Sequence, residues 1–237
     1  LSGGVDSSAI VALMSKVADQ QIRTFNVSFQ ENQYDESAFA RSMAQRCGTQ
    51  HQEIRLRADD FLQLLPAALQ AMDHPSGDGP NTYVVSKSTR EAGVTMALSG
   101  LGGDELFGGY SVFKQLHDLQ HHRWLNWTPA ALRRWGANAY QLWQPNIGGQ
   151  KTAAVLRLPQ ISALAAYPLY RQVLLDEQIQ ALSTLPVLPN NRVQELIQTQ
   201  LNTPGFIELP LYSQISVLEI QTYLQNVLLR DADQMSM

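Results

Sequence analysis

The sequence predicts an α/β fold built on a doubly wound parallel sheet and followed by a mostly helical C-terminal part. Three observations support this prediction. Short β-rich runs alternate with helical periodicity over the first hundred residues, two glycine-rich loops open with Ser-Gly where a strand is expected to end, and the remaining chain is typical of helices. We place the α/β part at residues 1–110 and the helical part at 111–237.

The elements of the α/β part follow from local signals. Strands are predicted at 24–29, 51–56 and 94–98, the last of them buried. The helices between them are predicted from near Asp6 to residue 19, from Asp35 to Arg46 with Phe39 and Met43 on one face and Gly48 as its stop, from 58 to 72, and from Pro80 to near Gly93. Residues 30–33 and 73–80 are predicted loops. Strands that alternate with helices imply a parallel sheet, which binds ligands at the carboxyl ends of its strands.

The composition is ordinary for a globular protein, with 44% hydrophobic and 16% charged residues among 237. The net charge of −4 argues against general nucleic-acid binding, whereas a nucleotide needs only local donors and a metal. Cys47 is the one cysteine, which excludes internal disulfides and indicates a reducing, cytoplasmic setting. No apolar run is long enough to span a membrane. The chain is expected to be the middle of a longer protein, because a strand should precede Ser2.

The first glycine-rich loop is Leu-Ser-Gly-Gly-Val-Asp-Ser-Ser, residues 1–8. Two adjacent glycines let the backbone turn sharply and approach a ligand closely. The free N–H groups of the following helix start, together with the hydroxyls of Ser2, Ser7 and Ser8, form an anion site. The loop is not a Walker loop, because no Gly-Lys-Ser/Thr follows the glycines.

Asp6 stands where a Walker loop has its lysine. A carboxylate beside a polyphosphate is repulsive unless a divalent cation lies between them. Asp6 is therefore either a magnesium ligand or an ordinary helix cap, and taken alone the cap is the better interpretation.

The second glycine-rich loop, residues 99–110, changes this balance. Its sequence, Ser-Gly-Leu-Gly-Gly-Asp-Glu-Leu-Phe-Gly-Gly-Tyr, repeats the order of an apolar run, Ser-Gly, glycine and a carboxylate. Placed side by side, the two loops would put Asp6 and Asp104 on one bound polyphosphate, with magnesium between them. A glycine-rich turn capped by Asp104 is the alternative for this loop alone.

Three segments carry a family resemblance. Residues 2–7 match the PP-loop of ATP pyrophosphatases, and 99–110 resemble the Ser-Gly-Glu-Gly-x-Asp-Glu-Leu-Phe-Gly-Gly-Tyr signature of glutamine-hydrolysing asparagine synthetases. Residues 228–237 are similar to that family's Leu-Arg-x-x-Asp-x-Met-Ser-Met segment, and 34–36 and 48–51 also fit. The resemblance covers 1–110 and 213–237 and is weak between them.

The resemblance implies an adenine-nucleotide α-hydrolase-like fold and the synthetase domain of an amide ligase. Such a domain uses ATP and Mg²⁺ to adenylate a carboxylate, aspartate by default, which ammonia from an upstream glutaminase domain then attacks. A homodimer is compatible with it. The ATP-binding residues that the resemblance implies are Leu1, Ser2, Gly3, Gly4, Val5, Asp6, Ser7, Val27, Ser28, Ser99 and Gly100. Asp6 and Asp104 would hold magnesium, while Arg230 and Asp233 would lie near the acyl substrate.

Leu101 departs from the family pattern, which has a glutamate placed near the reacting carboxylate and ammonia. Leucine can neither accept a proton nor stabilise an ammonium-like transition state. Adenylation remains the expectation, but the acyl substrate stays open. The competing hypotheses are a paralogue that amidates or cyclises a different acyl group, an ATP sensor without chemistry, and a nucleotide ligase acting on tRNA. The last of these should show a basic surface and catalytic cysteines, which this chain lacks.

The segment 111–160 holds all four tryptophans and six Lys/Arg residues against the single acid Asp118. Basic aromatic segments can lie on membranes or stack on nucleic-acid bases. More often they are helices that pack tryptophan inward and leave arginine solvated, and the spread of the basic residues favours this packing. The segment 164–201 is predicted as helices broken by Pro168, Pro186 and Pro189. The stripe of Val217, Ile220, Leu224, Val227 and Leu228 is predicted to be core.

Overall fold

The computed structural model describes residues 1–29, 36–184 and 191–236. It forms two compact units, one of Leu1–Asp104 with Tyr223–Met237 and one of Glu105–Thr222. The boundary between Asp104 and Glu105 lies a few residues before the predicted one at residue 110. Residues from Tyr223 onward belong to the first unit again. The predicted loop at 30–33, the cap Asp35 and the prolines Pro186 and Pro189 lie outside the described residues.

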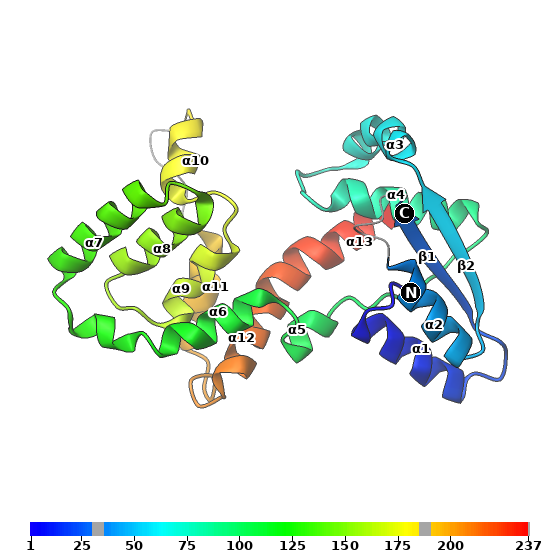
Figure 1. Ribbon diagram of the computed structural model, residues 1–237, viewed down its shortest axis with the longest axis horizontal. Coiled ribbons are helices and arrows are strands. Elements are labelled where there is room, and N and C mark those ends of the chain that lie inside the picture. The colour runs from blue at the N-terminus through cyan, green and yellow to red at the C-terminus, as the bar shows by residue number, and fades with distance from the viewer. Residues whose placement is uncertain (30–35, 185–190, 237) are drawn as a thin grey trace. The chain divides into compact units, whose positions relative to one another are not determined.

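The first unit is organised around two strands, β1 (Arg23–Phe29) and β2 (Gln50–Leu56), which pair in parallel (Figure 1). Their register runs from Arg23 opposite Gln50 to Phe29 opposite Leu56. Both predicted strands are confirmed. The helices of this unit are α1 (Val5–Val17), α2 (Ser37–Arg46), α3 (Ala58–Ala71), α4 (Gly79–Glu91) and α13 (Leu229–Ser236). Helices α1 to α4 agree with the predicted helices to within a few residues at each end, and α13 was not predicted as a separate helix.

The predicted buried strand at 94–98 is wrong. No strand forms there in the described structure, and Met96 and Leu98 are 88% and 72% exposed. Gly93, at φ +81°, ends α4, and the amide of Val94 donates to the carbonyl of Thr89. An apolar run becomes a strand only when a neighbouring strand supplies ladder partners, and composition cannot supply those. The doubly wound arrangement therefore stays a prediction, while the α/β class is confirmed.

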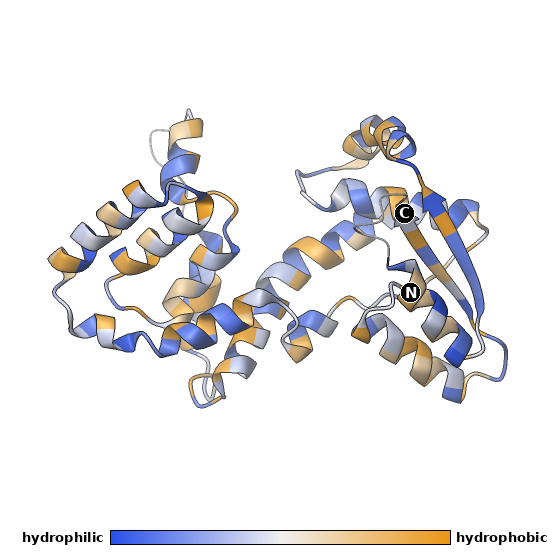
Figure 2. Cartoon of the chain, viewed as in Figure 1, coloured by the Kyte–Doolittle hydropathy of each residue, from blue (hydrophilic) through white to orange (hydrophobic). Residues whose placement is uncertain are grey.

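Helix α2 packs on the sheet through small side chains. Ala40 and Ala44 are fully buried, whereas Phe39 on the predicted apolar face is 70% exposed. Strand β1 alternates hydrophilic and hydrophobic residues (Figure 2). The residues that β1 buries are the polar ones Thr24, Asn26 and Ser28. The first unit thus has a polar layer inside it, which has to satisfy its own hydrogen bonds.

His51 on β2 is half-buried and joins that polar layer through Thr24. Its Nδ1 lies 2.9 Å from the hydroxyl of Thr24, which lies 2.9 Å from the hydroxyl of Thr49. The amide of Thr49 donates to the carbonyl of Ala44 and so links the layer to the end of α2, where Gly48 adopts φ +62°. Burial lowers the pKa of His51; Glu53 opposes this shift, and Arg41 adds to it. The neutral imidazole is therefore the form that the fold stabilises.

The second unit is entirely helical in the residues that the structure describes. Its helices are α5 (Gly103–Phe107, which begins in the first unit), α6 (Ser111–Gln120), the 3₁₀ helix η2 (Arg123–Trp127), α7 (Ala130–Trp143), α8 (Ile147–Arg157), α9 (Ala163–Arg171), α10 (Asp176–Leu182), α11 (Arg192–Leu201), α12 (Leu211–Glu219) and the π-helical stretch η3 (Ile220–Leu228, which ends in the first unit). Their shared core includes Phe113, Leu116, Tyr167, Ile215 and Leu218. Pro168 lies within α9 and does not break it.

The predicted inward packing of the tryptophans is wrong. Trp124, Trp127, Trp135 and Trp143 are 56%, 90%, 74% and 74% exposed. Arg133 is buried instead, and its guanidinium donates at 3.0 Å to the carbonyls of Leu158 and Pro159 after α8. The two carbonyls each need a hydrogen-bond donor. An indole ring has a single N–H, whereas a guanidinium has several and can bind both carbonyls.

We predict that the stability of the first unit falls as the pH drops below the ordinary histidine pKa of 6.5, partly through His51. The folded-state pKa is lowered, so below pH 6.5 the unfolded chain takes up a proton that the folded chain resists. Urea unfolding followed by circular dichroism between pH 5 and 8 should show the advantage of the wild type over His51→Asn shrinking toward low pH. The exposed His121→Gln variant is the control. A wild-type advantage that is constant across this range would contradict the assignment.

Candidate functional site

The first glycine-rich loop leads directly into α1. Gly4 is the residue before the helix, and no side chain caps that end. Asp6 therefore does not act as the cap: it lies half-buried in the first turn of α1, with no capping bond. No side chain of the described residues caps this end of α1, which leaves the amides of its first turn able to bind an anion.

The hydroxyls of this loop hold its shape. Ser2 Oγ accepts from the amide of Gly4 at 3.2 Å and lies 3.0 Å from Ser7 Oγ. Ser7 Oγ also donates to the carbonyl of Gly4 at 3.3 Å. Gly3 adopts φ +89°, and a Cβ there would lie 2.6 Å from the Cβ of Phe39. Only glycine fits that position, both for its backbone conformation and for its contact with α2.

The two glycine-rich loops contact one another. A Cβ on Gly100 would lie 3.0 Å from the amide nitrogen of Ser7, and one on Gly103 would lie 2.2 Å from Cγ of Asp6. The second loop turns through Gly102, at φ +93°, with the amide of Gly103 donating to the carbonyl of Gly100. The Asp6 carboxyl group therefore lies against the backbone of the residue that precedes Asp104.

Asp104 itself is half-buried at the start of α5. The described residues contain no group of three or more His, Cys, Asp or Glu side chains arranged to hold a metal ion. Two carboxylates can still hold magnesium when substrate phosphates and water complete its octahedron, which is the usual arrangement for this ion. The sharing of one ion by Asp6 and Asp104 stays a prediction.

The other residues expected to bind ATP lie in the first unit, on β1 and in the two loops. The amino group of Leu1 donates to the carbonyl of Phe25 at 2.6 Å, so the first loop begins beside β1. Further along that strand Val27 is half-buried and Ser28 is buried. Ser99 is exposed, and its hydroxyl accepts weakly from the amide of Leu101 at 3.5 Å. Val5 is 84% exposed, so its side chain is not part of the core.

Leu101 is 45% exposed in the second loop. It lies between Gly100 and Gly102, both of which belong to the turn that contacts the first loop. Its side chain thus presents an apolar surface at the position where the family pattern has a carboxylate.

In the C-terminal motif, residues 228–237, the buried charged residue is not one of the two expected to lie near the acyl substrate. Arg230 and Asp233 are exposed, while Asp231 between them is only 1% exposed. The hydroxyl of Ser76 donates to Asp231, and Nε2 of His74 lies 3.5 Å from its other oxygen. Sequence reasoning missed Asp231. Extending the apolar stripe of Leu224 and Leu228 by helical spacing to 231 and 235 would have found it.

Asp231 fixes the loop that leads into α4. Ser76 Oγ also accepts from the amides of Asp78 and Gly79 at 3.2 Å, where α4 begins. One hydroxyl therefore connects the buried carboxylate of α13 to the start of α4, and the two helices pack together in the first unit.

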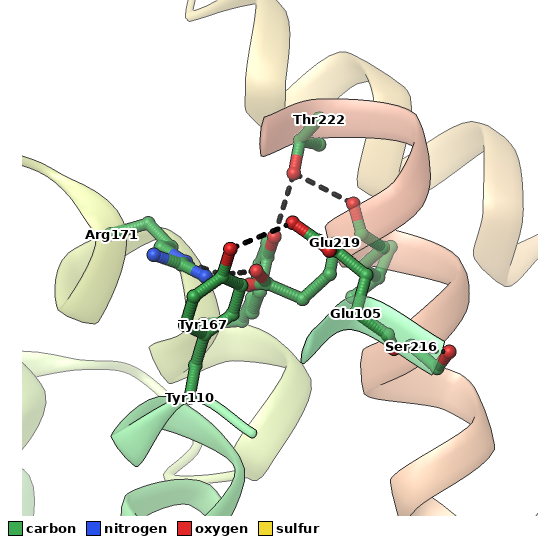
Figure 3. Close-up of polar contacts among 8 residues, drawn as sticks. Glu105, Tyr110, Tyr167, Arg171, Ser216, Glu219 and Thr222 are labelled. Carbon is green, nitrogen blue, oxygen red and sulfur yellow. Dashed lines mark hydrogen bonds and ion pairs between the residues drawn. The ribbon is translucent and has the colours of Figure 1, made fainter. Parts of the chain in front are cut away.

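The second glycine motif continues into a buried polar network in the second unit (Figure 3). Glu105, 1% exposed, accepts from the hydroxyl of Tyr110 at 2.9 Å, and its carbonyl accepts from Ser216 at 2.7 Å. The guanidinium of Arg171 lies 4.6 Å from the ring centre of Tyr110 and is paired with the fully buried Glu219. Burial, reinforced by Glu219, raises the pKa of Tyr167 well above its ordinary value. The motif's downstream half is thus anchored by polar contacts in a closed interior.

A pair of loops with helix-start amides, hydroxyls and carboxylates suits one class of ligand in particular. Amides and hydroxyls bind phosphate oxygens, and carboxylates bind them only through a divalent cation. A metal-bound nucleotide polyphosphate meets both conditions. No described helix combines the length and the apolarity needed to cross a bilayer.

Comparison with known proteins agrees with this chemistry. The asparagine synthase family model matches residues 1–237. The chain is similar to a protein of Methanocaldococcus jannaschii named as a glutamine-hydrolyzing asparagine synthetase, with 41% identity over 113 residues, 46% of the chain and 22% of the relative. It is also similar to asparagine synthetase 1 of Bacillus subtilis, with 34% identity over 117 residues, 48% of the chain and 18% of the relative.

A third relative is asparagine synthetase B of Escherichia coli, with 30% identity over 141 residues, 50% of the chain and 25% of the relative. In each case the matched part spans about a quarter of the relative's length or less. Because the family model matches from the first residue to the last, the chain belongs to the asparagine synthase family.

Proposed function

We propose that this chain is the ATP-binding synthetase part of an amide ligase that adenylates a carboxylate for attack by ammonia. The observation that carries this proposal is the contact of Gly100 and Gly103 with Asp6 and Ser7, which brings the two glycine-rich loops together. The family supports the same conclusion, since its relatives are named as glutamine-hydrolyzing asparagine synthetases. Aspartate is the acyl substrate that these names suggest, and ammonia would come from a glutaminase domain elsewhere in the full protein.

In the proposed reaction a carboxylate oxygen attacks the α-phosphorus of ATP and pyrophosphate leaves. Ammonia then attacks the acyl carbon, the amide forms and AMP leaves. The first loop, Ser2 to Ser7, would hold the leaving pyrophosphate through amides and hydroxyls, and Val27, Ser28, Ser99 and Gly100 would contact the adenosine. Aimed donors of this kind stabilise charge as it develops between the phosphates. A Mg²⁺ ion held by Asp6 and Asp104 would neutralise the phosphate oxygens.

Leu101 favours a second candidate for the acyl substrate. An exposed leucine in the second loop cannot act as a base or stabilise an ammonium ion, so a ligase with a different acyl substrate or amine is the alternative. Arg230 and Asp233 are proposed to face the acyl substrate, because both are exposed and adjoin the buried anchor Asp231.

The full-length protein, tested for pyrophosphate release with each proteinogenic carboxylate and with ammonia, separates these possibilities. Release that depends on aspartate supports asparagine synthesis. Release that depends on another acid supports the second candidate. If no acid elicits pyrophosphate although ATP binds, the proposed ligase activity is wrong and the chain is an ATP-binding module.

We predict that Asp6→Asn and Asp104→Asn each lower pyrophosphate release at least about a hundredfold, the size of effect seen when one electrostatic stabiliser of a transition state is removed. Asparagine removes the negative charge of the aspartate and keeps its shape, so the two glycine-rich loops should still contact one another. Magnesium titration of the wild type and both variants tests the shared ion. The solvated Asp118→Asn variant is the control, and full turnover in Asp6→Asn would refute the metal assignment.

We also predict that Gly103→Ala weakens ATP binding. A Cβ there would overlap the Asp6 carboxyl group at 2.2 Å, so the two loops must separate. Isothermal titration with ATP and Mg²⁺ should show at least about a tenfold loss of affinity, an ordinary coupling for a displaced loop. Gly136→Ala is the matched control, since its Cβ would meet nothing within 4 Å. Unchanged affinity in Gly103→Ala would show that the contact of the loops is not needed.

A further inference from the structure

His74 lies between two carboxyl groups in the loop that connects α3 to α4. Its Nδ1 is 2.7 Å from an oxygen of Asp73, and its Nε2 is 3.5 Å from Oδ1 of Asp231 on α13. The side chain of Asp73 is 76% exposed, whereas those of His74 and Asp231 are 19% and 1% exposed. The imidazole therefore joins a carboxyl group in solvent to a buried one.

The two atoms that face one another at 3.5 Å are both buried, and neither makes a hydrogen bond within the residues that the structure describes. Ser76 donates to Oδ2 of Asp231, so Oδ1 is the oxygen that faces His74. An ionised carboxylate only accepts hydrogen bonds, and so does an imidazole nitrogen without a proton. Two buried acceptors that face each other would both lack a donor, which destabilises the fold.

A change of tautomer does not supply the missing donor. Nδ1 of His74 lies 2.7 Å from the carboxyl oxygen of Asp73 and needs its own N–H to donate to it. A neutral imidazole has one N–H, so it can donate to only one of the two carboxylates. His74 and Asp231 together therefore need one proton more than a neutral histidine and an ionised aspartate carry.

We propose that His74 and Asp231 share this proton and that the resulting contact positions α13 against the loop before α4. Whether the proton is on Nε2 or on Oδ1, it makes a donor that joins the loop to the helix. When the pair loses the proton, two acceptors face each other and the contact is lost. Helix α13 should therefore loosen as the pH rises. His74 acts through Asp231, which makes it a positioning residue.

The charged groups that contact His74 are Asp73 from its own loop and Asp231 from α13. Helix α13 also packs against α3 and α4. Within the described ranges, neither of these two helices supplies a charged side chain that pairs with the imidazole. Arg230 and Asp233, the other charged residues of α13, are exposed. Both charges at the imidazole are thus negative, and loss of the proton removes an attraction on each side.

The consequence for catalysis depends on the proposed function, in which Arg230 and Asp233 face the acyl substrate. Both residues adjoin Asp231 on α13, so a movement of that helix moves them. The residues proposed to bind ATP lie instead in the two glycine-rich loops and on β1. The contact of His74 should therefore affect the binding of the acid more than the binding of ATP.

Amide hydrogen exchange tests the contact without relying on activity. Peptides of the full-length protein that cover 229–236 are followed by mass spectrometry between about pH 6 and pH 9, with the intrinsic pH dependence of exchange divided out. In the wild type, their protection should fall at least about tenfold across this range, because a buried hydrogen bond to a charged group is lost. In His74→Gln, whose amide can donate to Asp231 and does not titrate, protection should change by less than about twofold.

Two further variants separate the shared proton from a general loosening. Ser76→Ala removes the other contact of Asp231, so it should lower protection at every pH and keep the pH dependence. His74→Leu has no N–H and should be as weakly protected at low pH as the wild type is at high pH. His51 titrates in all of these proteins, so its contribution cancels when each variant is compared with the wild type.

Steady-state kinetics test the positioning role. With the acid that elicits pyrophosphate release, His74→Leu should raise the KM for that acid at least about tenfold and leave the KM for ATP within about twofold. His74→Gln should restore most of the acid KM, because its amide again supplies a donor. The exposed His121→Gln variant is the control and should match the wild type.

Two outcomes would overturn the proposal. Protection of α13 that is constant with pH in the wild type, or that falls equally in His74→Gln, would show that no shared proton holds the helix. An acid KM in His74→Leu equal to that of the wild type would show that the contact does not position the acyl site. A wild type that releases no pyrophosphate with any acid would refute the proposed function alone, since hydrogen exchange still decides whether the pair holds α13.

Discussion

The close approach of two backbone turns is the constraint on which the proposed site depends. The Asp6 carboxyl group occupies the space that any side chain on Gly103 would need, and a Cβ on Gly100 would make a tight contact, 3.0 Å, with the amide nitrogen of Ser7. Glycine is required there because of its missing Cβ, independent of any preference for an unusual φ. The contact brings helix-start amides and a carboxylate together at one place, and that combination suits a metal-bound polyphosphate.

Each unit has a buried carboxylate that anchors a neighbouring segment. In the first unit Asp231 binds Ser76, which in turn accepts from the amides at the start of α4. In the second unit Glu105 binds Tyr110, whose ring faces Arg171. Both anchors are buried carboxylates that act through a hydroxyl. Buried carboxylates are expensive to leave without partners, so each one restricts the loop or helix that supplies its donor.

The buried polar residues of the first unit form defined hydrogen bonds with one another. Thr24 and Asn26 on β1 are buried, and His51 joins Thr24 and Thr49 in one chain of hydrogen bonds. A neutral histidine in this position makes the fold sensitive to protonation, which an apolar layer would not be. The small residues of α2 allow the helix to approach this layer closely.

The sequence by itself determined the local features: the strands at 24–29 and 51–56, the turn at Gly48, the helix starts near Asp6 and Pro80, and the two glycine-rich loops. Each depends on nearby residues, whose propensities and spacing are visible in the chain. Only the tertiary structure decided which residues lie inside. It left the apolar run 94–98 without a ladder partner, buried Arg133 instead of the tryptophans and chose Asp231 over its neighbours. Ladder pairing and buried hydrogen bonds join residues far apart in the chain, and composition carries no record of which donor will meet which acceptor.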